Sequence, residues 1–540
     1  MNALSVLYAG DVKTPAFKKV FSDGSGDLSC AFSLSLRAAS SFSGVTKLLL
    51  LTSESAECML STLKPLPDMP CQIEIVQHDT WNIKTLLELI ANKAEGFDFV
   101  YFAFADCPFL DAGLAKRLAV RHCEFSADYS YADGWPLGFA PEIANPSTFV
   151  FLSKILDTNA DLASSAVRRD VLFSVLEKDI NSFDIETEIS DVDYRRYRLT
   201  LASDSERNLL LLQRFYSCAS LNTPRDADSI SDADRATRMD EICKIILAKP
   251  EILRTLPAFY SVQVTDQCPQ QCVICPYPEI SKGLSKKQEM SVSDFDKLMD
   301  KIVEFSSDAV IDLSLWGEIA LHPFKIELID SVLKRPSLSL VIETCGIGWR
   351  DGELERIADI FSSAKPRFNG MSALSLIVSL DGIDEASYKK LRGDGFTEAF
   401  ATAKKIFALF GKNAYIQTVR IKGSELDTEK FYRYWAETEK ANVIVQKYDD
   451  FCAAMPALRA ADLSPIKRLP CNHIMRDMSI LVDGTVPMCK EWTVSPIIGN
   501  VFTEPLSEIW ERNEAVYKKH CTGEYPEICT HCDEYWTFNF

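Results

Sequence analysis

Residues 265–278, with the sequence TDQCPQQCVICPYP, decide the fold and the chemistry that we predict for this chain. Cys268, Cys272 and Cys275 have the spacing Cx3Cx2C, so one short loop can place three thiolates around a [4Fe–4S] cube. Three thiolates leave one iron without a protein ligand, and an open iron can bind a further molecule. A zinc knot or three incidental thiols are the alternatives, but zinc normally takes four ligands and no nearby His or Cys completes the set.

Predicted strands and helices alternate along the chain around this loop, from residue 260 to residue 448. We predict strands at 260–266, 309–316, 338–344, 373–380, 414–421 and 442–448, because these segments are short, apolar and rich in branched or aromatic residues. Helical patterns fill the gaps, and the one at 293–305 has Ser293 as its expected N-cap. Six parallel strands with helical crossovers make an open or partly closed barrel, whose ligands lie at the carboxyl ends of the strands.

The preceding part of the chain predicts a separate α/β sheet covered by helices on both faces. Its apolar segments at 3–10, 46–53 and 97–106 indicate buried strands, and its helical patterns lie at 28–40, 83–94 and 111–125. Residues 221–235 are polar and acidic with Pro and Ser, which is typical of a linker. We therefore predict four parts: a first domain at 1–220, a linker and helix at 221–257, the barrel at 258–450 and a small metal-held domain at 451–540.

Composition excludes several classes of function. Of the 540 residues, 47% are hydrophobic and 25% charged, which is typical of a folded globular protein. The net charge of −19 argues against a nucleic-acid or membrane-surface partner, because both are anionic. No apolar run approaches the roughly 20 residues that span a bilayer. The 17 cysteines are odd in number, clustered and without an export signal, so we predict a cytoplasmic metalloprotein rather than a disulfide framework.

The cysteine loop after a first barrel strand resembles that of the radical S-adenosylmethionine (SAM) superfamily. Motifs behind the next strands agree in order: SLWGEIALHP (314–323) resembles the family's Gly-Gly-Glu-Pro segment, and IETCG (342–346) resembles its Thr-Asn-Gly. Trp316 and Ile319 depart from the first of these motifs, and Cys345 departs from the second. VSLDGIDEASYKKLRG (378–393) closely resembles the family's Ser-Leu-Asp-Gly…Arg-Gly run.

This resemblance covers about residues 258–450 and implies a partial (β/α)6 barrel that binds SAM. It implies that SAM chelates the open iron and is cleaved reductively to methionine and a 5′-deoxyadenosyl radical, which abstracts a hydrogen atom from the substrate. Arg392 would pair with the SAM carboxylate, which its planar guanidinium suits. The SAM-binding residues that the resemblance implies are Gly317, Glu318, Thr344, Ser379 and Arg392.

The end of the chain contains a second constellation of cysteines, Cys471, Cys489, Cys529 and Cys532. The thiols alone fit a zinc ribbon as well as an iron–sulfur site. The sequence motifs around these cysteines resemble those of the SPASM domain. They are, in order, Asp-Gly-x-Val-x-x-Cys, Gly-Asn, Leu-x-x-Ile-Trp and Cys-x-x-Cys. That resemblance implies one auxiliary [4Fe–4S] cluster with these four ligands. Cys521 is either a bystander, which we favour, or a replacement for one of the four. In some members of this family, the residue directly after the cysteine that matches Cys489 is an Asp that acts as the catalytic base. Lys490 stands at this position here, so we assign no catalytic base.

The first domain resembles nucleotide-sugar cytidylyltransferases of the GT-A fold. Its DCPFLD (106–111), followed by PLGFAPE (136–142), carries the residues that match: Asp106, Asp111, Pro136, Gly138 and Glu142. YRLTLASDSERNLL (197–210) resembles the family's Arg-Leu-Thr-Val-Asp segment, which supplies a metal-binding Asp. Without a gap, that Asp falls on Ala202, and Asp204 is the candidate to replace it. The loop 9–24 lacks the arginines that would offset a triphosphate, although it contains Lys13, Lys18 and Lys19, so we predict a recognition or structural module.

The order of the three parts resembles that of the spiro-SPASM proteins. We predict a radical SAM oxidoreductase or maturase that acts on a peptide or small molecule, and that takes electrons from a donor such as flavodoxin or ferredoxin. The alternatives are a sugar- or nucleotide-directed radical SAM dehydrogenase, a nucleotidyltransferase with a redox-sensing iron–sulfur module, and a non-enzymatic metal scaffold.

Overall fold

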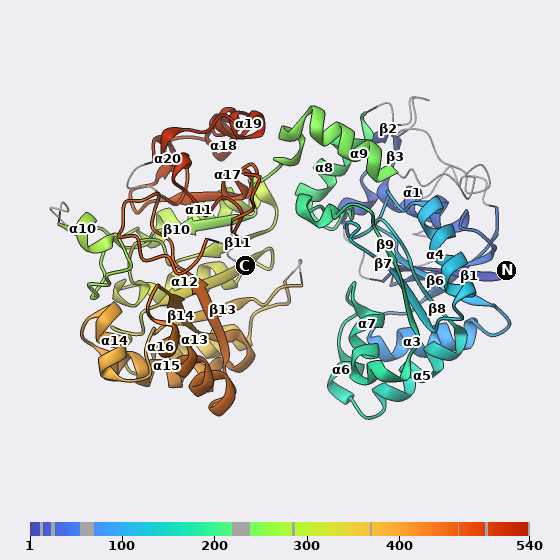
Figure 1. Ribbon diagram of the computed structural model, residues 1–540, viewed down its shortest axis with the longest axis horizontal. Helices are drawn as coiled ribbons and strands as arrows, with labels where there is room; N and C mark the ends of the chain where they lie inside the picture. Colours follow the sequence, from blue (N-terminus) through green and yellow to red (C-terminus); the bar gives the residue numbers. More distant parts are fainter. Residues whose placement is uncertain are drawn as a thin grey trace. The chain divides into compact units, whose positions relative to one another are not determined.

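The computed structural model describes residues 1–10, 14–22, 28–53, 70–218, 238–282, 287–367, 370–462, 464–491 and 495–537. The chain divides into two units, Met1–Ile252 and Leu253–Phe540, each built on a seven-stranded sheet (Figure 1). The predicted linker at 221–235 lies outside the described residues. None of the described helices is long and apolar enough to cross a membrane.

The first unit has a mixed sheet with the strand order β5-β4-β1-β6-β8-β7-β9. Strands β1, β4, β5 and β6 are mutually parallel, whereas β8 runs antiparallel to both β6 and β7. The strands are β1 (Ala3–Ala9), β4 (Val45–Thr52), β5 (Gln72–Gln77), β6 (Phe99–Phe104), β7 (Tyr129–Asp133), β8 (Glu142–Ala144) and β9 (Ile185–Ile189). The helices of this unit that matter below are α1 (Ala31–Ser40), α3 (Ile83–Lys93), α4 (Ala112–Glu124), α5 (Pro146–Leu156), α7 (Val171–Leu176), α8 (Glu206–Tyr216) and α9 (Arg238–Ala248).

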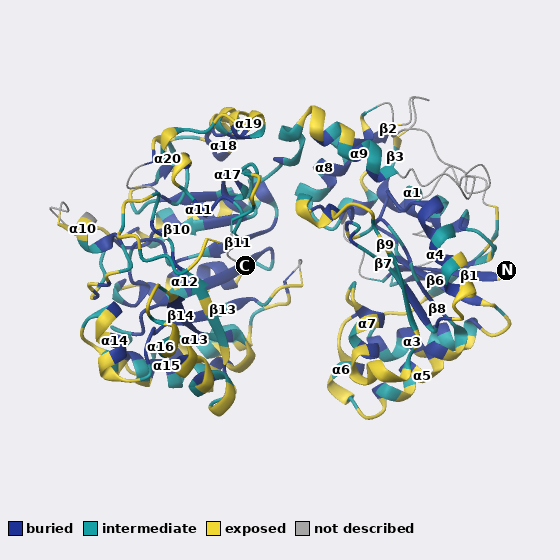
Figure 2. Cartoon of the chain, in the orientation of Figure 1, coloured by how far each residue is buried: buried dark blue, intermediate teal, exposed yellow. Residues whose placement is uncertain are grey.

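Strand β1 is buried on both faces because helices cover both sides of its sheet. Its alternate residues Ala3 and Leu7 pack with α1 and α4, while Leu4 and Val6 pack with α3 and α5. Successive side chains of a strand point to opposite faces, so a strand covered on both faces is a continuous apolar run. Figure 2 shows the strands of this sheet mainly as buried and the outer surfaces of the helices as exposed.

The second unit is the predicted barrel, with parallel strands in the consecutive order β15-β14-β13-β12-β11-β10. Helices lie between successive strands, so each crossover returns the chain to the same end of the sheet. The strands are β10 (Phe259–Val262), β11 (Ala309–Asp312), β12 (Leu338–Thr344), β13 (Leu374–Ser379), β14 (Ala414–Arg420) and β15 (Asn442–Lys447). The main helices are α11 (Val292–Ser306), α12 (Lys325–Leu333), α13 (Glu353–Ser362), α14 (Glu385–Arg392), α15 (Phe396–Phe410) and α16 (Glu425–Tyr432). The predicted fold class is confirmed.

The structure corrects three details of this sheet. Strands β10 and β11 end at Val262 and Asp312, earlier than predicted, so the residues that follow are free to form loops at the strand ends. Ser291, not Ser293, is the N-cap of α11, because its hydroxyl accepts a hydrogen bond from the backbone N–H of Asp294 at 3.0 Å. A seventh strand, β16 (Asp477–Ile480), comes from the C-terminal segment and pairs in parallel with β10.

The C-terminal segment therefore builds part of the barrel sheet as well as a small region of its own. That region contains α17 (Asn472–Arg476), the antiparallel pair β17 (Thr485–Pro487) and β18 (Ile497–Asn500), and the helices α18 (Leu506–Arg512), α19 (Glu514–Thr522) and α20 (Glu527–Thr530). Arg254, just before the barrel, stacks on the ring of Trp510 at 3.6 Å and donates hydrogen bonds to the carbonyls of Trp510 and Ile474. This buried cation ties the start of the barrel to α17 and α18.

Candidate functional site

The predicted cysteine loop lies at the carboxyl end of β10 and is held by backbone contacts. The N–H of Val273 donates to the carbonyl of Leu391, at the end of α14, over 2.9 Å. The hydroxyl of Tyr277 accepts from the N–H of Cys268 at 2.9 Å and donates to the carbonyl of Asp266 at 2.8 Å. The loop is thus closed on itself and fixed against the fourth crossover of the barrel.

The three thiols of this loop lie close together: Cys272 and Cys275 both contribute to a raised pKa of Cys268, and Cys272 contributes to that of Cys275. Burial is the main cause, and it raises the pKa of Cys268 to about 12 and that of Cys275 to about 11. Burial also raises the pKa of Cys272, which the nearby Arg392 opposes, with its Nη1 atom 3.9 Å from the sulfur. Buried thiols that need a cationic partner to ionise fit an iron–sulfur group.

The described residues contain no group of three Cys, His, Asp or Glu side chains placed to hold a single metal ion. Zinc would require sulfurs about 2.3 Å from one centre. A cube distributes its thiolates over different irons, so the sulfurs around it need not converge on one point.

Gly317 is the point where the second strand-end loop meets the first. A Cβ atom at this position would lie 1.9 Å from the carbonyl oxygen of Thr265, so only glycine can stand here. The next N–H, that of Glu318, donates to the carbonyl of Gln267 at 2.7 Å. Trp316, which replaces the first glycine of the resembling motif, has a φ of 53° and so keeps a backbone conformation that favours glycine.

Glu318 and Thr344 are brought together by the structure, as neighbours at the ends of β11 and β12. The buried Glu318 carboxylate accepts hydrogen bonds from the Thr344 hydroxyl and the Cys345 N–H, both at 2.7 Å, and from the Ala320 N–H at 3.1 Å. The Thr344 oxygen also accepts from the indole N–H of Trp349 at 3.0 Å. Both side chains therefore fix the shape of the loops, and their part in SAM binding stays a prediction.

Ser379 and Arg392 lie at the same end of the sheet but have different partners. Ser379 donates to Glu343 and accepts from the side-chain amide of Gln417 at 3.0 Å, so it faces the interior of the barrel. Arg392 is paired with the buried Asp381, with its Nε atom 2.6 Å from the carboxylate. In this orientation, the Nη1 atom of Arg392 lies 3.9 Å from the sulfur of Cys272.

Two cavities open at this end of the barrel. One, of about 260 Å³, is bordered by Cys272, Cys275 and Arg392, and the other, of about 370 Å³, extends into the barrel. The residues that line both cavities are Asp312, Glu343, Gln446 and Lys447.

Two of the carboxyl groups in these cavities were missed by our sequence prediction. Burial raises the pKa of Asp312 to about 6, and Ser314 and Ser261 partly offset this by hydrogen bonding to its carboxylate. Glu343 accepts from the amide of Gln417 at 2.7 Å. An acidic residue inside an otherwise apolar segment that is predicted to be a buried strand is a signal that could have identified both.

The four predicted C-terminal ligands also gather in one place. Cys471 is the N-cap of α17, Cys489 follows β17, and Cys529 and Cys532 lie in and after α20. Cys471 is surrounded by the other three, and burial together with these thiols raises its pKa well above the usual value. The segments are tied by backbone hydrogen bonds, including that from the N–H of Asn472 to the carbonyl of Tyr535 at 2.7 Å.

Cys452 is a fifth thiol at this group, which the sequence did not indicate because it lies outside the Cys-containing motif. Its side chain hydrogen-bonds to that of Cys532, which raises the pKa of Cys452 and lowers that of Cys532. Cys489 is also close enough to raise the pKa of Cys452. Residues 451–453 all have positive φ, so the backbone turns sharply where it presents this thiol. The signal that could have found Cys452 is its place directly after the last barrel strand.

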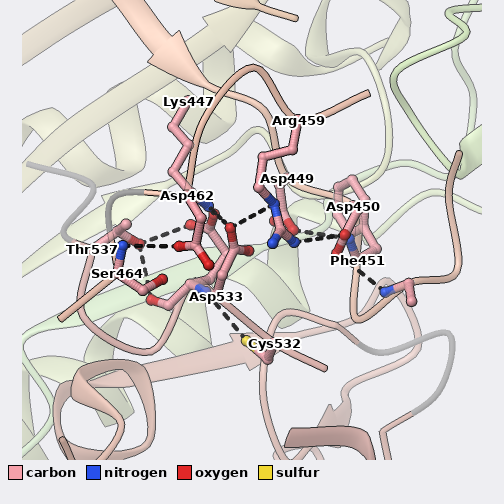
Figure 3. A network of polar contacts seen from close by, with 12 residues as sticks. Lys447, Asp449, Asp450, Phe451, Arg459, Asp462, Ser464, Cys532, Asp533 and Thr537 are labelled. Carbon is pink, nitrogen blue, oxygen red and sulfur yellow. Dashed lines mark hydrogen bonds and ion pairs between the residues drawn. The ribbon is translucent and has the colours of Figure 1, made fainter. Parts of the chain in front are cut away.

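An ionic network links the last barrel strand to the C-terminal residues (Figure 3). Asp533 forms ion pairs with Lys447 at 2.7 Å and with Arg459 at 2.9 Å, and Arg459 also contacts Asp450 at 2.6 Å. Lys490 lies 2.8 Å from Asp449 within the same region. Figure 3 shows Cys532 directly beside this network. The network therefore joins the auxiliary thiols to the end of β15, where Lys447 lines the barrel cavities.

The transferase-like residues of the first unit have structural partners. Asp111 caps α4 by accepting from the N–H of Leu114 at 2.8 Å. Pro136 and Gly138 form a turn in which Gly138 has a φ of 84°. Glu142 lies on β8 and accepts from the hydroxyl of Tyr129. Burial is the main cause that raises the pKa of Glu142, to about 7.

This raised pKa predicts a pH-dependent stability. Because the folded state holds the Glu142 proton more tightly, stability falls as pH rises from the unfolded value near 4.3 to about 7, and the loss stays constant above that. Glu142→Gln removes the effect, so at pH 8 it should be about 1–3 kcal/mol more stable than the wild type and equal to it at pH 4. Urea unfolding of the full chain from pH 4 to 8 measures the difference. Glu124→Gln, at an exposed position of α4, is the control, and a Glu142→Gln curve parallel to the wild-type curve would contradict the prediction.

Comparison with known proteins agrees with this geometry. Residues 471–533 match the SPASM family, which is described as an iron–sulfur cluster-binding domain. The chain is therefore an iron–sulfur protein with a C-terminal SPASM domain, which confirms this part of the sequence prediction and its iron–sulfur cofactor.

The family itself follows from a full-length relative. A protein of Treponema pallidum (strain Nichols), described as uncharacterized, is 33% identical over 377 residues, which are 68% of this chain and 98% of the relative. The chain belongs to the family of that Treponema protein.

The chain is also similar to solved structures, at a lower sequence identity than to the Treponema protein. Streptococcus suis SuiB bound to the precursor peptide SuiA is 15% identical, with a TM-score of 0.38, over 54% of this chain and 74% of SuiB. A cytidylyltransferase from Leptospira borgpetersenii serovar Hardjo-bovis is 16% identical, with a TM-score of 0.34, over 46% of this chain and 95% of that chain.

Proposed function

We propose that this protein is a radical SAM enzyme with one auxiliary [4Fe–4S] cluster. Cys268, Cys272 and Cys275 would hold the first cluster, and the C-terminal thiols would hold the second. The observation that carries the proposal is the position of the three-thiol loop: it lies at the carboxyl end of β10, beside Arg392, and borders a cavity that adjoins the barrel interior.

Held by these residues, the clusters and SAM would supply the radical chemistry of hydrogen abstraction. The residues of the protein position the reactants and exclude water from the site. Arg392, oriented by Asp381, presents its guanidinium beside Cys272, where it suits the carboxylate of SAM. Gly317 allows the second loop to approach the first, which positions backbone groups next to the cysteine loop.

The cavities indicate the scale and polarity of the substrate. Together they suit a small molecule or one side chain of a peptide rather than a folded domain. Asp312, Glu343 and Lys447 line both cavities, so the reacting part of the substrate is expected to be polar. The cluster that the C-terminal thiols would hold would supply a site for electron transfer, and the partner that we propose as electron donor is a protein such as flavodoxin or ferredoxin.

The proposal is tested by SAM cleavage. Protein reconstituted anaerobically with iron and sulfide is mixed with SAM and dithionite, and 5′-deoxyadenosine is measured by liquid chromatography. We expect 5′-deoxyadenosine above the level of a cluster-free control. Protein that contains both clusters, shown by iron content and absorbance, and yet leaves SAM intact would overturn the proposal.

Cys452 predicts a measurable effect on the auxiliary cluster. If the four C-terminal ligands hold the cluster, Cys452 acts as a hydrogen-bond donor to the sulfur of Cys532. Such a donor stabilises the more negative, reduced state, so Cys452→Ala should keep its iron while the midpoint potential falls by roughly 20–60 mV, the equivalent of one net hydrogen bond. Redox titration followed by electron paramagnetic resonance (EPR) measures the shift.

The matched comparison is Cys489→Ala, which should lose the auxiliary cluster altogether. Loss of iron in Cys452→Ala would instead show that Cys452 is a ligand. An unchanged potential with full iron content would show that this thiol has no influence on the cluster.

A further inference from the structure

The first unit contains a buried ion pair at the place where its transferase-like sequence predicts a metal. Asp106 follows β6 and has a side chain that is only 5% exposed. Arg169, just before α7, donates to both of its carboxylate oxygens, from Nη1 at 3.1 Å and from Nη2 at 2.6 Å. Such a two-point contact uses the planar shape of the guanidinium and fixes both partners.

A second carboxylate completes this arrangement. Asp204, just before α8, lies 3.4 Å from the same Nη2 atom of Arg169, and its other oxygen accepts from the amide of Asn208 at 2.7 Å. Ala202, on which the ungapped comparison placed the second acid, is fully buried in the apolar core. The structure therefore brings Asp106 and Asp204 together, with the guanidinium of one arginine between them.

A divalent cation and this guanidinium would compete for the same oxygen atoms. Arg169 is always charged, and it also lies over the ring of Phe104, with its guanidinium carbon 5.0 Å from the ring centre. Lys18, one of the few cations expected for a triphosphate, is instead paired with Glu206. The two aspartates and Arg169 together carry a net negative charge, which disfavours a triphosphate.

We propose that Arg169 is a built-in cation that takes the position of a divalent metal ion, so that the first unit binds an uncharged organic ligand without metal and does not bind a metal–nucleoside triphosphate. The ligand site is the adjoining pocket of about 270 Å³, which Arg169 lines together with Phe104, Tyr131, Trp135 and Glu142. The buried indole N–H of Trp135 has no hydrogen-bond partner among the described residues, and it offers a donor to such a ligand. Aromatic walls with few polar groups are typical of small-molecule sites.

The test is a gain of metal binding. Mn²⁺ is titrated into the wild-type holoprotein and into Arg169→Met, and the EPR signal of free Mn²⁺ is followed, because Mn²⁺ prefers carboxylate ligands. Removing the guanidinium leaves two carboxylates without their cation, so we expect Arg169→Met to bind Mn²⁺ at least about tenfold more tightly than the wild type. Adding Asp204→Asn should abolish the gain, whereas Arg169→Lys, which keeps the charge, should resemble the wild type.

Either arm can overturn the proposal. A folded Arg169→Met variant with the Mn²⁺ affinity of the wild type would contradict it. The second arm uses the wild type with Mn²⁺ and CTP and does not depend on the folding of the Arg169 variant. Saturable Mn²⁺–CTP binding that Asp204→Asn removes would refute the proposal, and the absence of such binding supports it.

Discussion

Cys272→Ala is expected to abolish SAM cleavage and to lower the iron content of the reconstituted protein by about half, which is the share of one of two cubes. Cys272 is buried, whereas Cys268 and Cys275 are half-buried, and its sulfur is the one that faces Arg392. Two thiolates cannot hold a cube firmly in a loop of this size. Iron and sulfide analysis, with 5′-deoxyadenosine production, measures both effects.

The control for this variant is Cys123→Ser, which changes an exposed cysteine on α4 of the first unit. It should keep both the iron and the activity. Wild-type rates of SAM cleavage in Cys272→Ala would place the reactive cluster elsewhere. If both clusters were lost in Cys272→Ala, thermal unfolding of the variant would show whether the fold of the barrel had been lost with them.

Gly317→Ala is expected to reduce SAM affinity by more than tenfold and the free energy of unfolding by about 1–3 kcal/mol, the usual cost of overpacking. The added methyl group would lie 1.9 Å from the backbone carbonyl of Thr265, so the two strand-end loops must move apart. That shift would also break the hydrogen bond between the N–H of Glu318 and the carbonyl of Gln267. Isothermal titration of SAM into the reconstituted variant measures the loss, and its iron content shows whether the first cluster is still present.

Gly523→Ala provides a control with a similar backbone cost. Gly523 has a φ of 82° at the end of α19, but no atom lies within 4 Å of the position of its Cβ, so alanine is strained there without a collision. A left-handed alanine costs roughly 1–2 kcal/mol. This variant should therefore lose stability and keep its SAM affinity. Equal SAM affinity in Gly317→Ala and the wild type would show that the approach of the two loops is not required for binding.

Local patterns were enough to predict six of the seven strands of the barrel sheet, but only β1, β4 and β6 of the seven strands of the first sheet. Strand β12 has the predicted bounds, β13 is shorter than predicted by one residue at each end, and β14 and β15 are each shorter by one residue at one end. A strand covered on both faces is a short apolar run, which is why these segments could be recognised. The main differences, at β10 and β11, arise because apolar residues continue past the last ladder hydrogen bond into the loops. Strand β16 could not be predicted, since four residues that pair with a strand more than 200 positions away carry no local signal.

The sequence by itself determined the two α/β sheets, the three-thiol loop at the end of the first barrel strand and the SPASM domain, because spacing and periodicity act over a few neighbouring residues. Only the tertiary structure brought Cys452 to Cys532, placed Asp312 and Glu343 in one pair of cavities, and put Arg169 between Asp106 and Asp204. These contacts join residues from different loops. Their geometry depends on how whole elements pack, and no pattern within one segment of the chain contains that information.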